Sequence, residues 1–387
     1  METIFWISVL GLVAVYAGYG LMLAVINKLV PQKPKHKLIT NDELPAVAML
    51  IAAYNEEDII KAKIENTLAL DYPANKLKIY VVADGSLDKT VQIVSGYEKV
   101  TLLYQSQRKG KSAAITRAMQ YINEPVTAFT DANVMLDKGA LRTLVKHYGD
   151  KLVGGVSGEK VVMADERAAA ASTEGLYWKY ESFLKKQDAK LSSLTGAAGE
   201  FFSIRTRLFR PVAEDTLLDD FEITMQVIRQ GYSIKYEPAA LAVEKPSANI
   251  DEEYKRKVRI AAGGLQLILR NPDFLNPLIY GAFSFQYLIH RVSRWTVTPV
   301  LLVLAFITNI FLLQDGIAYD ILFGTQLLFH LAALTGWYFN RRHLKIKAFH
   351  VPFYFDFMHY CVVMGWFKYL KGKQTANWQK ATRLSYN

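Results

Sequence analysis

The sequence predicts an α/β protein with a mostly parallel central sheet, flanked by transmembrane and interfacial helices. Between residues 44 and 270, short apolar runs alternate with amphipathic helical patterns, which is typical of a parallel sheet covered by helices. Uncharged apolar runs precede and follow this region. The mean hydropathy of +0.08, in a chain with 46 lysines and arginines, fits such a segregation of apolar residues from charges.

The first predicted element is a transmembrane helix at 1–30. The stretch from Thr3 to Asn27 carries no charge and exceeds the roughly 20 residues that a membrane helix needs. Lysines follow it and only Glu2 precedes it, so we expect a retained anchor whose C-terminal end faces the cytoplasm. A buried core helix is the alternative, but such helices are usually shorter and amphipathic.

The C-terminal region, 295–387, is expected to hold a transmembrane hairpin, a third apolar segment and a basic tail. The uncharged runs Trp295–Gln314 and Ile321–Asn340 predict the hairpin, and basic residues on both flanks place its ends in the cytoplasm. Just before it, 272–294 is expected to form an amphipathic interfacial helix.

The third apolar segment, Ala348–Phe367, contains Pro352, Asp356 and His359. A crossing would put the basic tail outside, so a re-entrant or interfacial helix is expected, with a third membrane helix as the alternative. Asp356 and His359 lie one helical turn apart. Their pairing would satisfy two polar groups at a helix interface, or else form a proton relay or metal site.

Within 44–270, the polar residues follow the predicted strands. These strands are Val47–Ala53, Leu77–Ala83, Val100–Tyr104 and Val126–Thr130. The clusters 54–56, 84–86 and 131–133 come after the first, second and fourth of them, where parallel sheets bind ligands. Each cluster also has a local interpretation, since Asn55 and Ser86 are good helix N-caps and Asp84-Gly85 is a turn.

Together, these clusters and the basic segment 108–111 predict a pocket for a nucleotide diphosphate and a divalent metal. A dinucleotide-binding domain is the competing fold, but it would need a glycine-rich turn where Ala52–Glu56 stands. The net charge of +10 would also suit a nucleic-acid binder. No motif that interleaves aromatic and basic residues is present, so we expect no nucleic-acid partner. Cys361, the single cysteine, excludes an intrachain disulfide.

Seven motifs resemble, in order and approximate spacing, those of family 2 glycosyltransferases, in particular the membrane-integrated bacterial branch related to cellulose, hyaluronan and poly-N-acetylglucosamine synthases. They are AAYNEE (52–57), ADGSLDKT (83–90), RKGKSAA (108–114), TDAN (130–133), TGAAGEFFSIR (195–205), LLDDFEIT (217–224) and RKVRIAAGG (256–264). The resemblance extends from Val47 to about Trp295. It implies a cytoplasmic nucleotide-diphospho-sugar transferase domain of the GT-A type at 44–270.

The resemblance also implies which residues bind the nucleotide-sugar donor. They are Ala53, Tyr54, Glu56, Asp84, Lys111, Asp131, Arg256 and Arg259. Ala83 stands where the family often has a further acid. Asp131 and Asn133 occupy the family's DxD positions and would hold Mg²⁺ or Mn²⁺, although the amide of Asn133 supplies an oxygen without a charge.

By the same resemblance, Asp220 is the general base that accepts the proton of the attacking acceptor hydroxyl. Asp219 and Glu222 are close in sequence and are expected to raise the pKa of that base. Acceptor binding falls to a loop of mostly small residues, which lets a sugar approach the backbone, and to Asp219. The loop residues are Gly196, Ala197, Ala198, Gly199 and Glu200. An acidic first helical turn and a plain loop are the structural alternatives.

Arg256 and Arg259 lie at the position of the family's QxxRW motif, with Ile260 in place of its tryptophan. Arginines three apart share a helical face and can bind a diphosphate, unless they are simply solvated. The missing tryptophan and the few membrane segments favour addition of one sugar over extrusion of a polymer.

The sequence thus predicts an inverting glycosyltransferase that uses a nucleotide donor, a UDP-sugar by preference, and a lipid-linked or growing saccharide as acceptor. It would act in the bacterial inner membrane, with membrane lipid and other polysaccharide-export or biosynthesis subunits as further partners. A processive synthase that extrudes its polymer and a catalytically inactive membrane scaffold are the alternatives.

Overall fold

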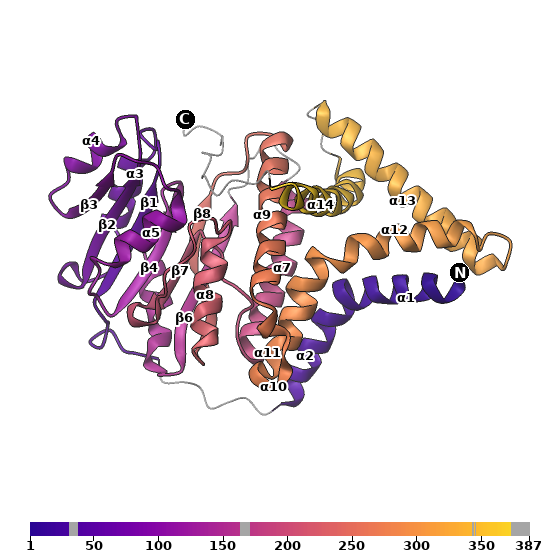
Figure 1. The fold of residues 1–387 in the computed structure, drawn as a ribbon, viewed down its shortest axis with the longest axis horizontal. Coiled ribbons are helices and arrows are strands. Elements are labelled where there is room, and N and C mark those ends of the chain that lie inside the picture. Colours follow the sequence, from indigo (N-terminus) through magenta and orange to yellow (C-terminus); the bar gives the residue numbers. More distant parts are fainter. Residues whose placement is uncertain (31–37, 163–170, 343, 345, 373–387) are drawn as a thin grey trace. The chain divides into compact units, whose positions relative to one another are not determined.

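The computed structural model describes residues 1–30, 38–162, 171–342, 344 and 346–372 (Figure 1). The chain forms two compact units, each built from separate stretches of sequence. The helical unit comprises Met1–Leu29, Ala164–Gln187 and Ala248–Gln374, and the sheet unit comprises Val30–Met163, Asp188–Ser247 and Thr375–Asn387. The contiguous range 44–270 stays a prediction of the catalytic domain, but its described residues 171–187 and 248–270 belong to the same compact unit as the terminal helices.

The sheet unit is built on a mixed sheet. Its strands are β1 (Val47–Ala53), β2 (Leu77–Asp84), β3 (Val100–Gln105), β4 (Val126–Asp131), β5 (Val134–Leu136), β6 (Val153–Val162), β7 (Phe201–Arg205) and β8 (Ser233–Glu244). Across the sheet they follow the order β3-β2-β1-β4-β7-β6-β8-β5. Neighbours among β1, β2, β3 and β4 are parallel, as are β6 and β8, whereas β7 runs antiparallel to β4 and β6, and β5 to β8. The predicted α/β class with a mostly parallel sheet is confirmed.

Helices flank this sheet and bury it. All seven residues of β1 are buried, as expected for a central parallel strand that is covered on both faces and therefore reads as a continuous apolar run. The sheet unit's helices are α3 (Ile60–Leu68), α4 (Thr90–Ser95), α5 (Lys111–Met119), α6 (Ala140–Val145) and α8 (Asp219–Arg229). Ile60 and Ile64 of α3 and Leu141 and Leu144 of α6 join the strands in one apolar core.

The strand register decides which loops share an edge of the sheet. Ala53 pairs with Ala83 and Ala52 with Asp131, so β1, β2 and β4 end side by side. Because β7 is antiparallel to β4, its first residue, Phe201, lies opposite Thr130. The loop that enters β7 therefore lies at the same edge as the loops that leave β1, β2 and β4.

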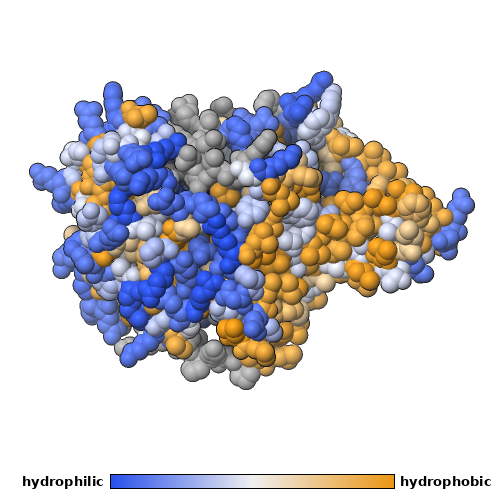
Figure 2. Space-filling view, viewed as in Figure 1, coloured by the Kyte–Doolittle hydropathy of each residue, from blue (hydrophilic) through white to orange (hydrophobic). Residues whose placement is uncertain are grey.

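The helical unit contains the candidate membrane segments. Its longer helices are α1 (Glu2–Val13), α2 (Tyr19–Leu29), α7 (Ala171–Leu191), α9 (Ile250–Arg270), α12 (Val297–Ile310), α13 (Ile317–Arg341) and α14 (Lys347–Leu370). Two helical stretches among the described residues are long and apolar enough to cross a membrane: Glu2–Leu29, which runs from α1 through α2, and Ile317–Arg341, which is α13. A further candidate is formed by Ala282–Ser293 with Val297–Ile310, which are bent by 57° relative to each other. Apolar side chains cover α12 and α13 in Figure 2. Val303 of α12 and Leu334 of α13 are both exposed.

The interfacial helix expected at 272–294 is not one helix. The segment consists of short helical pieces at Pro272–Leu275, α10 (Pro277–Tyr280), α11 (Ala282–Tyr287) and Leu288–Ser293. Pro277 has no amide hydrogen for a continuous helix, and Gly281 has a φ of 56°, which ends α10. The first arm of the predicted hairpin is also shorter than expected, because α12 has only 14 residues.

The expected pairing of Asp356 with His359 is wrong. Oδ2 of Asp356 lies 2.8 Å from Nδ1 of His330 on α13, whereas Nε2 of His359 lies 2.9 Å from the hydroxyl of Tyr16. Residues three apart on a helix point in directions about 60° apart, so these two side chains of α14 meet different neighbours. Two polar contacts from α14 to the candidate membrane segments Glu2–Leu29 and Ile317–Arg341 take the place of one contact within a helix.

Candidate active site

The loops after β1 and β2 are tied to each other. The side chain of Asn55 accepts a hydrogen bond from the Leu87 amide at 2.8 Å, and the Asn55 amide donates to Oγ of Ser86 at 3.1 Å. The N-cap positions of the helices that follow are occupied instead by Ile59 and Lys89. The expected N-cap roles of Asn55 and Ser86 are therefore wrong, since both side chains serve to join neighbouring loops.

Asp84 organises the basic segment before α5. Its Oδ2 accepts hydrogen bonds from the backbone amides of Lys109 at 2.9 Å and Gly110 at 2.7 Å. Gly85 has a φ of 67°, and a β-carbon there would lie 2.7 Å from that of Arg108, so only glycine fits this approach. The carboxylate thus fixes the loop that leads to Lys111.

Tyr54 lies beside the same basic segment. The guanidinium carbon of Arg108 lies 3.7 Å from the centroid of the Tyr54 ring, a cation–π contact. Glu56 is buried, and its backbone amide donates to Oγ1 of Thr90 at 2.8 Å. Ala53 is the buried last residue of β1. Four residues predicted to bind the donor, Ala53, Tyr54, Glu56 and Asp84, therefore lie on two loops joined by hydrogen bonds.

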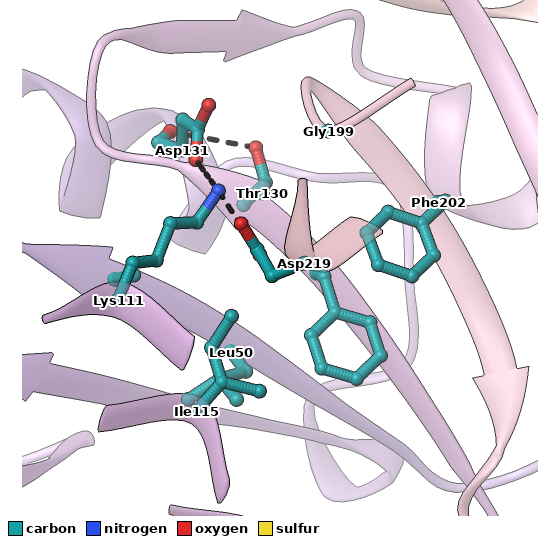
Figure 3. Close-up of a pocket in the computed structure, with 10 residues that line it drawn as sticks. Leu50, Lys111, Ile115, Thr130, Asp131, Gly199, Phe202 and Asp219 are labelled. Carbon is teal, nitrogen blue, oxygen red and sulfur yellow. Dashed lines mark hydrogen bonds and ion pairs between the residues drawn. The ribbon is translucent and has the colours of Figure 1, made fainter. Parts of the chain in front are cut away.

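Lys111 connects these loops to the acidic side of the site. It is the first residue of α5, and its ammonium lies 2.8 Å from Oδ1 of Asp131 and 3.4 Å from Oδ2 of Asp219 (Figure 3). Burial opposes the charge of Lys111, but the carboxylates of Asp131, Asp219 and Asp220 outweigh it and raise the pKa of the ammonium. Lys111 is thus a fixed positive charge between the ends of β4 and α8.

A small pocket opens at this point. Its walls are formed by Leu50, Ala52, Lys111, Ile115, Phe129, Thr130, Asp131, Gly199, Phe202 and Asp219. Figure 3 shows the Lys111 side chain reaching between the two carboxylates, with Gly199 and Phe202 across from it. The pocket therefore joins one predicted donor residue, Lys111, to the predicted metal ligand Asp131 and the predicted acceptor residues Gly199 and Asp219.

Asp220 lies in the first turn of α8, next to Asp219. Burial and the negative charge of Asp219 raise its pKa to about 7, with Glu200 adding to the rise and Lys111 opposing it. A carboxyl group with such a pKa exchanges its proton near neutral pH, as a general base requires. The expected effect of Asp219 on the pKa of Asp220 is present. The other two charged residues that shift this pKa, Lys111 and Glu200, are distant in sequence.

The loop 196–200 lies against Asp220. A β-carbon on Gly199 would lie 3.0 Å from Oδ2 of Asp220, and one on Gly196, whose φ is 99°, would lie 2.3 Å from the Phe221 ring. The Ala197 amide donates to Oγ1 of Thr224 at 3.2 Å, which ties the loop to α8. The small residues thus bring the loop's backbone close to the carboxylate.

Asp131 and Asn133 differ in their surroundings. Asp131 faces Lys111, whereas Nδ2 of Asn133 lies 3.4 Å from Oε1 of Glu244, the last residue of β8. Among the residues that the structure describes, no three His, Cys, Asp or Glu side chains group to hold a metal ion. Two oxygen ligands do fit a cation that also binds substrate phosphates and water, as Mg²⁺ does in many phosphate sites.

Two buried lysines next to the site were missed by the sequence analysis. Lys63 on α3 donates to Oγ1 of Thr130 at 3.0 Å and to the Val134 carbonyl at 2.5 Å, and burial lowers its pKa to about 7. Lys160 on β6 pairs with Glu200 and Glu244. The position of Lys63 between Ile60 and Thr67 on the buried face of a helix was the available signal.

Arg256 and Arg259 lie on α9, in the helical unit. The guanidinium of Arg256 lies 3.4 Å from a carboxylate oxygen of Glu253, one turn earlier. Their part in donor binding stays a prediction.

The sheet order and the pocket at the strand ends define a GT-A fold, and a solved structure shares it. The mannosyltransferase PcManGT from Pyrobaculum calidifontis, in complex with GDP-Man and Mn²⁺, matches with a TM-score of 0.73 at 20% identity, over 96% of this chain and 100% of that chain. At this identity the likeness shows the fold alone.

Part of the chain matches a known family model. The family model Glycosyl transferase family 2 matches residues 49–212. Poly-beta-1,6-N-acetyl-D-glucosamine synthases are similar: that of Staphylococcus aureus is 24% identical over 62% of this chain and 59% of its own length. That of Staphylococcus epidermidis is 20% identical over 86% of this chain and 82% of its own length. The match thus spans less than two thirds of the Staphylococcus aureus relatives. These comparisons support a family 2 glycosyltransferase, with the family 2 domain at residues 49–212.

Proposed function

We propose that this chain is an inverting glycosyltransferase that transfers a sugar from a UDP-sugar to a lipid-linked or growing saccharide. The reaction would take place at the cytoplasmic face of a bacterial inner membrane, into which the helical unit inserts. Candidate membrane helices and the family support membrane association. The donor sugar, acceptor and orientation belong to the proposal.

The observation that carries the proposal is Asp220, a half-buried carboxyl group that has a pKa of about 7 and lies against Gly199. In its ionised form it accepts the proton of an acceptor hydroxyl. The hydroxyl oxygen forms a bond to the anomeric carbon, and the bond from that carbon to the donor's phosphate oxygen breaks, leaving its electron pair on the nucleoside diphosphate. Attack opposite the leaving group inverts the anomeric centre.

On the donor side, Lys111 stabilises the developing negative charge of the leaving diphosphate, and Asp84 holds the loop that leads to Lys111. Tyr54, with Arg108 against its ring, would form a wall of the nucleobase site, and Ala53 and Glu56 would complete it. Asp84 contributes by shaping this loop. Arg256 and Arg259 of the helical unit would add positive charge near the diphosphate.

Asp131 and Asn133 would hold a divalent cation, Mg²⁺ or Mn²⁺. When bound, the cation supplies positive charge to the diphosphate oxygens. Asp131 provides the charged oxygen and Asn133 a neutral one, while Lys111 neutralises Asp131 in the absence of the cation. The similar mannosyltransferase from Pyrobaculum calidifontis is in complex with Mn²⁺, which supports this assignment.

The test is nucleoside diphosphate release by the purified full-length protein, given a panel of nucleotide sugars with Mn²⁺ or Mg²⁺. Turnover is expected with a UDP-sugar, with loss on chelation and in Asp220→Asn. Glu222→Gln is the matched control, because Glu222 lies in the same helical turn and contacts Gln226. No release with any donor would overturn the proposal and favour an inactive scaffold, and full turnover by Asp220→Asn would overturn the base.

The names of the Staphylococcus relatives favour a second candidate, a processive polysaccharide synthase. Chain length distinguishes the two. If the purified protein converts a short acceptor into products longer by one sugar, single addition holds, whereas long polymers formed early in the reaction would support the synthase.

A further inference from the structure

Lys160 is buried among the groups that surround the loop 196–200. Its side chain is 1% exposed, and its ammonium pairs with Oε1 of Glu200 and Oε2 of Glu244. A buried charge is costly unless it is paired, so a lysine between two carboxylates marks an arrangement with a specific geometric role. The motifs and the proposed chemistry leave this lysine without a function.

The strand register explains why these groups meet. Lys160 on β6 pairs with Ala242 on β8, so Glu244 at the end of β8 lies two residues further along the neighbouring strand. Side chains two apart on a strand point to the same face. Val134, the first residue of β5, lies opposite Glu244, and this brings the preceding Asn133 to within 3.4 Å of the Glu244 carboxylate.

The loop 196–200 is held at several points. Three hydrogen bonds hold its backbone. The amides of Ala197 and Ala198 donate to the hydroxyl groups of Thr224 and Ser157, the latter over 3.4 Å. The hydroxyl group of Thr130 donates to the Glu200 carbonyl over 3.0 Å. Lys160 alone among these partners holds a side chain of the loop by an ion pair. Glu200 directly follows Gly199, the residue whose backbone lies against Asp220.

We propose that Lys160 is a positioning residue for acceptor transfer, which holds Glu200, and with it the backbone of Gly199, at the catalytic carboxylate. The same ammonium also pairs with Glu244, and Glu244 in turn contacts Asn133. Lys160 thereby joins the acceptor loop to the proposed metal loop. This inference rests on the proposed function of the same site. Lys160 contacts no reacting atom.

The first test compares Lys160→Met with Lys151→Met, an exposed lysine in the turn before β6. In Lys160→Met, Glu200 and Glu244 repel each other without the ammonium, and the loop moves from Asp220. The expected result is an acceptor KM higher and a kcat lower by about 10-fold or more. Lys151→Met should behave as the wild type.

A second variant separates positioning from stability. Lys160→Met/Glu244→Gln removes one of the two repelling charges, so its melting temperature should recover relative to Lys160→Met. Glu200 still lacks its ammonium, so the acceptor KM should stay high. Recovery of both would overturn the proposal, because Lys160 would then act only by stabilising the fold. An unchanged acceptor KM and kcat in Lys160→Met would overturn it as well.

Turnover by the wild type distinguishes failure of the proposed function from failure of the positioning role of Lys160. A wild type that releases no nucleoside diphosphate refutes the proposed function, and the positioning role falls with it. A wild type that turns over while Lys160→Met matches it refutes the positioning role alone.

Discussion

Gly199 and Asp220 approach so closely that a β-carbon on the glycine would lie 3.0 Å from Oδ2 of the carboxylate. The sequence places them twenty-one residues apart, on a loop and on a helix. This approach leaves the carboxylate facing backbone, with no side chain of residue 199 in between.

Gly199→Ala should therefore lower kcat by about 10-fold or more, since the added methyl group displaces either the loop or the base. The matched control is Gly139→Ala, where the new β-carbon would lie at an ordinary 3.7 Å from Oδ2 of Asp137. Steady-state kinetics of both variants measure the effect. Equal kinetics of Gly199→Ala and the wild type would show that the contact has no role in turnover.

The activity should depend on pH through Asp220. Because the base must be ionised and its pKa is about 7, kcat/KM should rise as the pH increases through about 7. Asp219→Asn removes a negative charge that raises this pKa, so the midpoint should move to lower pH. Rate profiles of both proteins provide the measurement, and a midpoint that stays unchanged or rises in the variant would contradict the assignment.

Asp220 should also cost stability at high pH. Its pKa is raised on folding from 3.8 to about 7, so the folded state binds the proton more tightly. Its contribution to stability is full below pH 3.8 and is lost as the pH rises through about 7. Asp220→Asn should accordingly raise the melting temperature at alkaline pH by on the order of 5 °C, and by less in acid. Thermal unfolding at two pH values tests this, and an equal shift at both would argue against it.

Asn133→Asp should raise the affinity for a divalent metal and lower the stability of the metal-free protein. A second carboxylate strengthens binding of a divalent cation, so the Mn²⁺ concentration for half-maximal binding of nucleoside diphosphate should fall about 10-fold. The same carboxylate would face the buried Glu244, and the melting temperature without metal should fall. Calorimetry and thermal unfolding measure the two effects. Asn133→Ala is the control, in which metal affinity should fall.

The ends of β1, β2, β3 and β4 agree with the predicted strands within one residue, because each is a short, mainly apolar run. The sequence analysis gave no account of β6, whose apolar pattern is interrupted by Gly154, Gly155, Gly158 and Lys160. The single helix predicted at 272–294 is broken at Pro277 and Gly281, which interrupt the helical backbone.

For the site, the motifs predicted that Lys111, Asp131, Gly199 and Asp219 serve one reaction, and the structure brings them to one pocket. Lys63 and Lys160 were beyond reach for a physical reason. The role of a buried lysine depends on the groups that its ammonium contacts. Those groups are brought to it by strand pairing between segments far apart in the sequence. The cap interpretation of Asn55 and Ser86 failed in the same way, because each side chain bonds a neighbouring loop.

The interleaving of the two compact units sets an order for their folding during synthesis. The sheet unit lacks β8 until about residue 244 has been made, and the helical unit lacks α14 until residue 370. The first helix is therefore made well before its later partners in the helical unit, while α7 emerges between two parts of the sheet. A chain that ends after β8 would contain α1 and α7 but lack their partners α9, α12 and α14. Its unpacked apolar helices would favour aggregation.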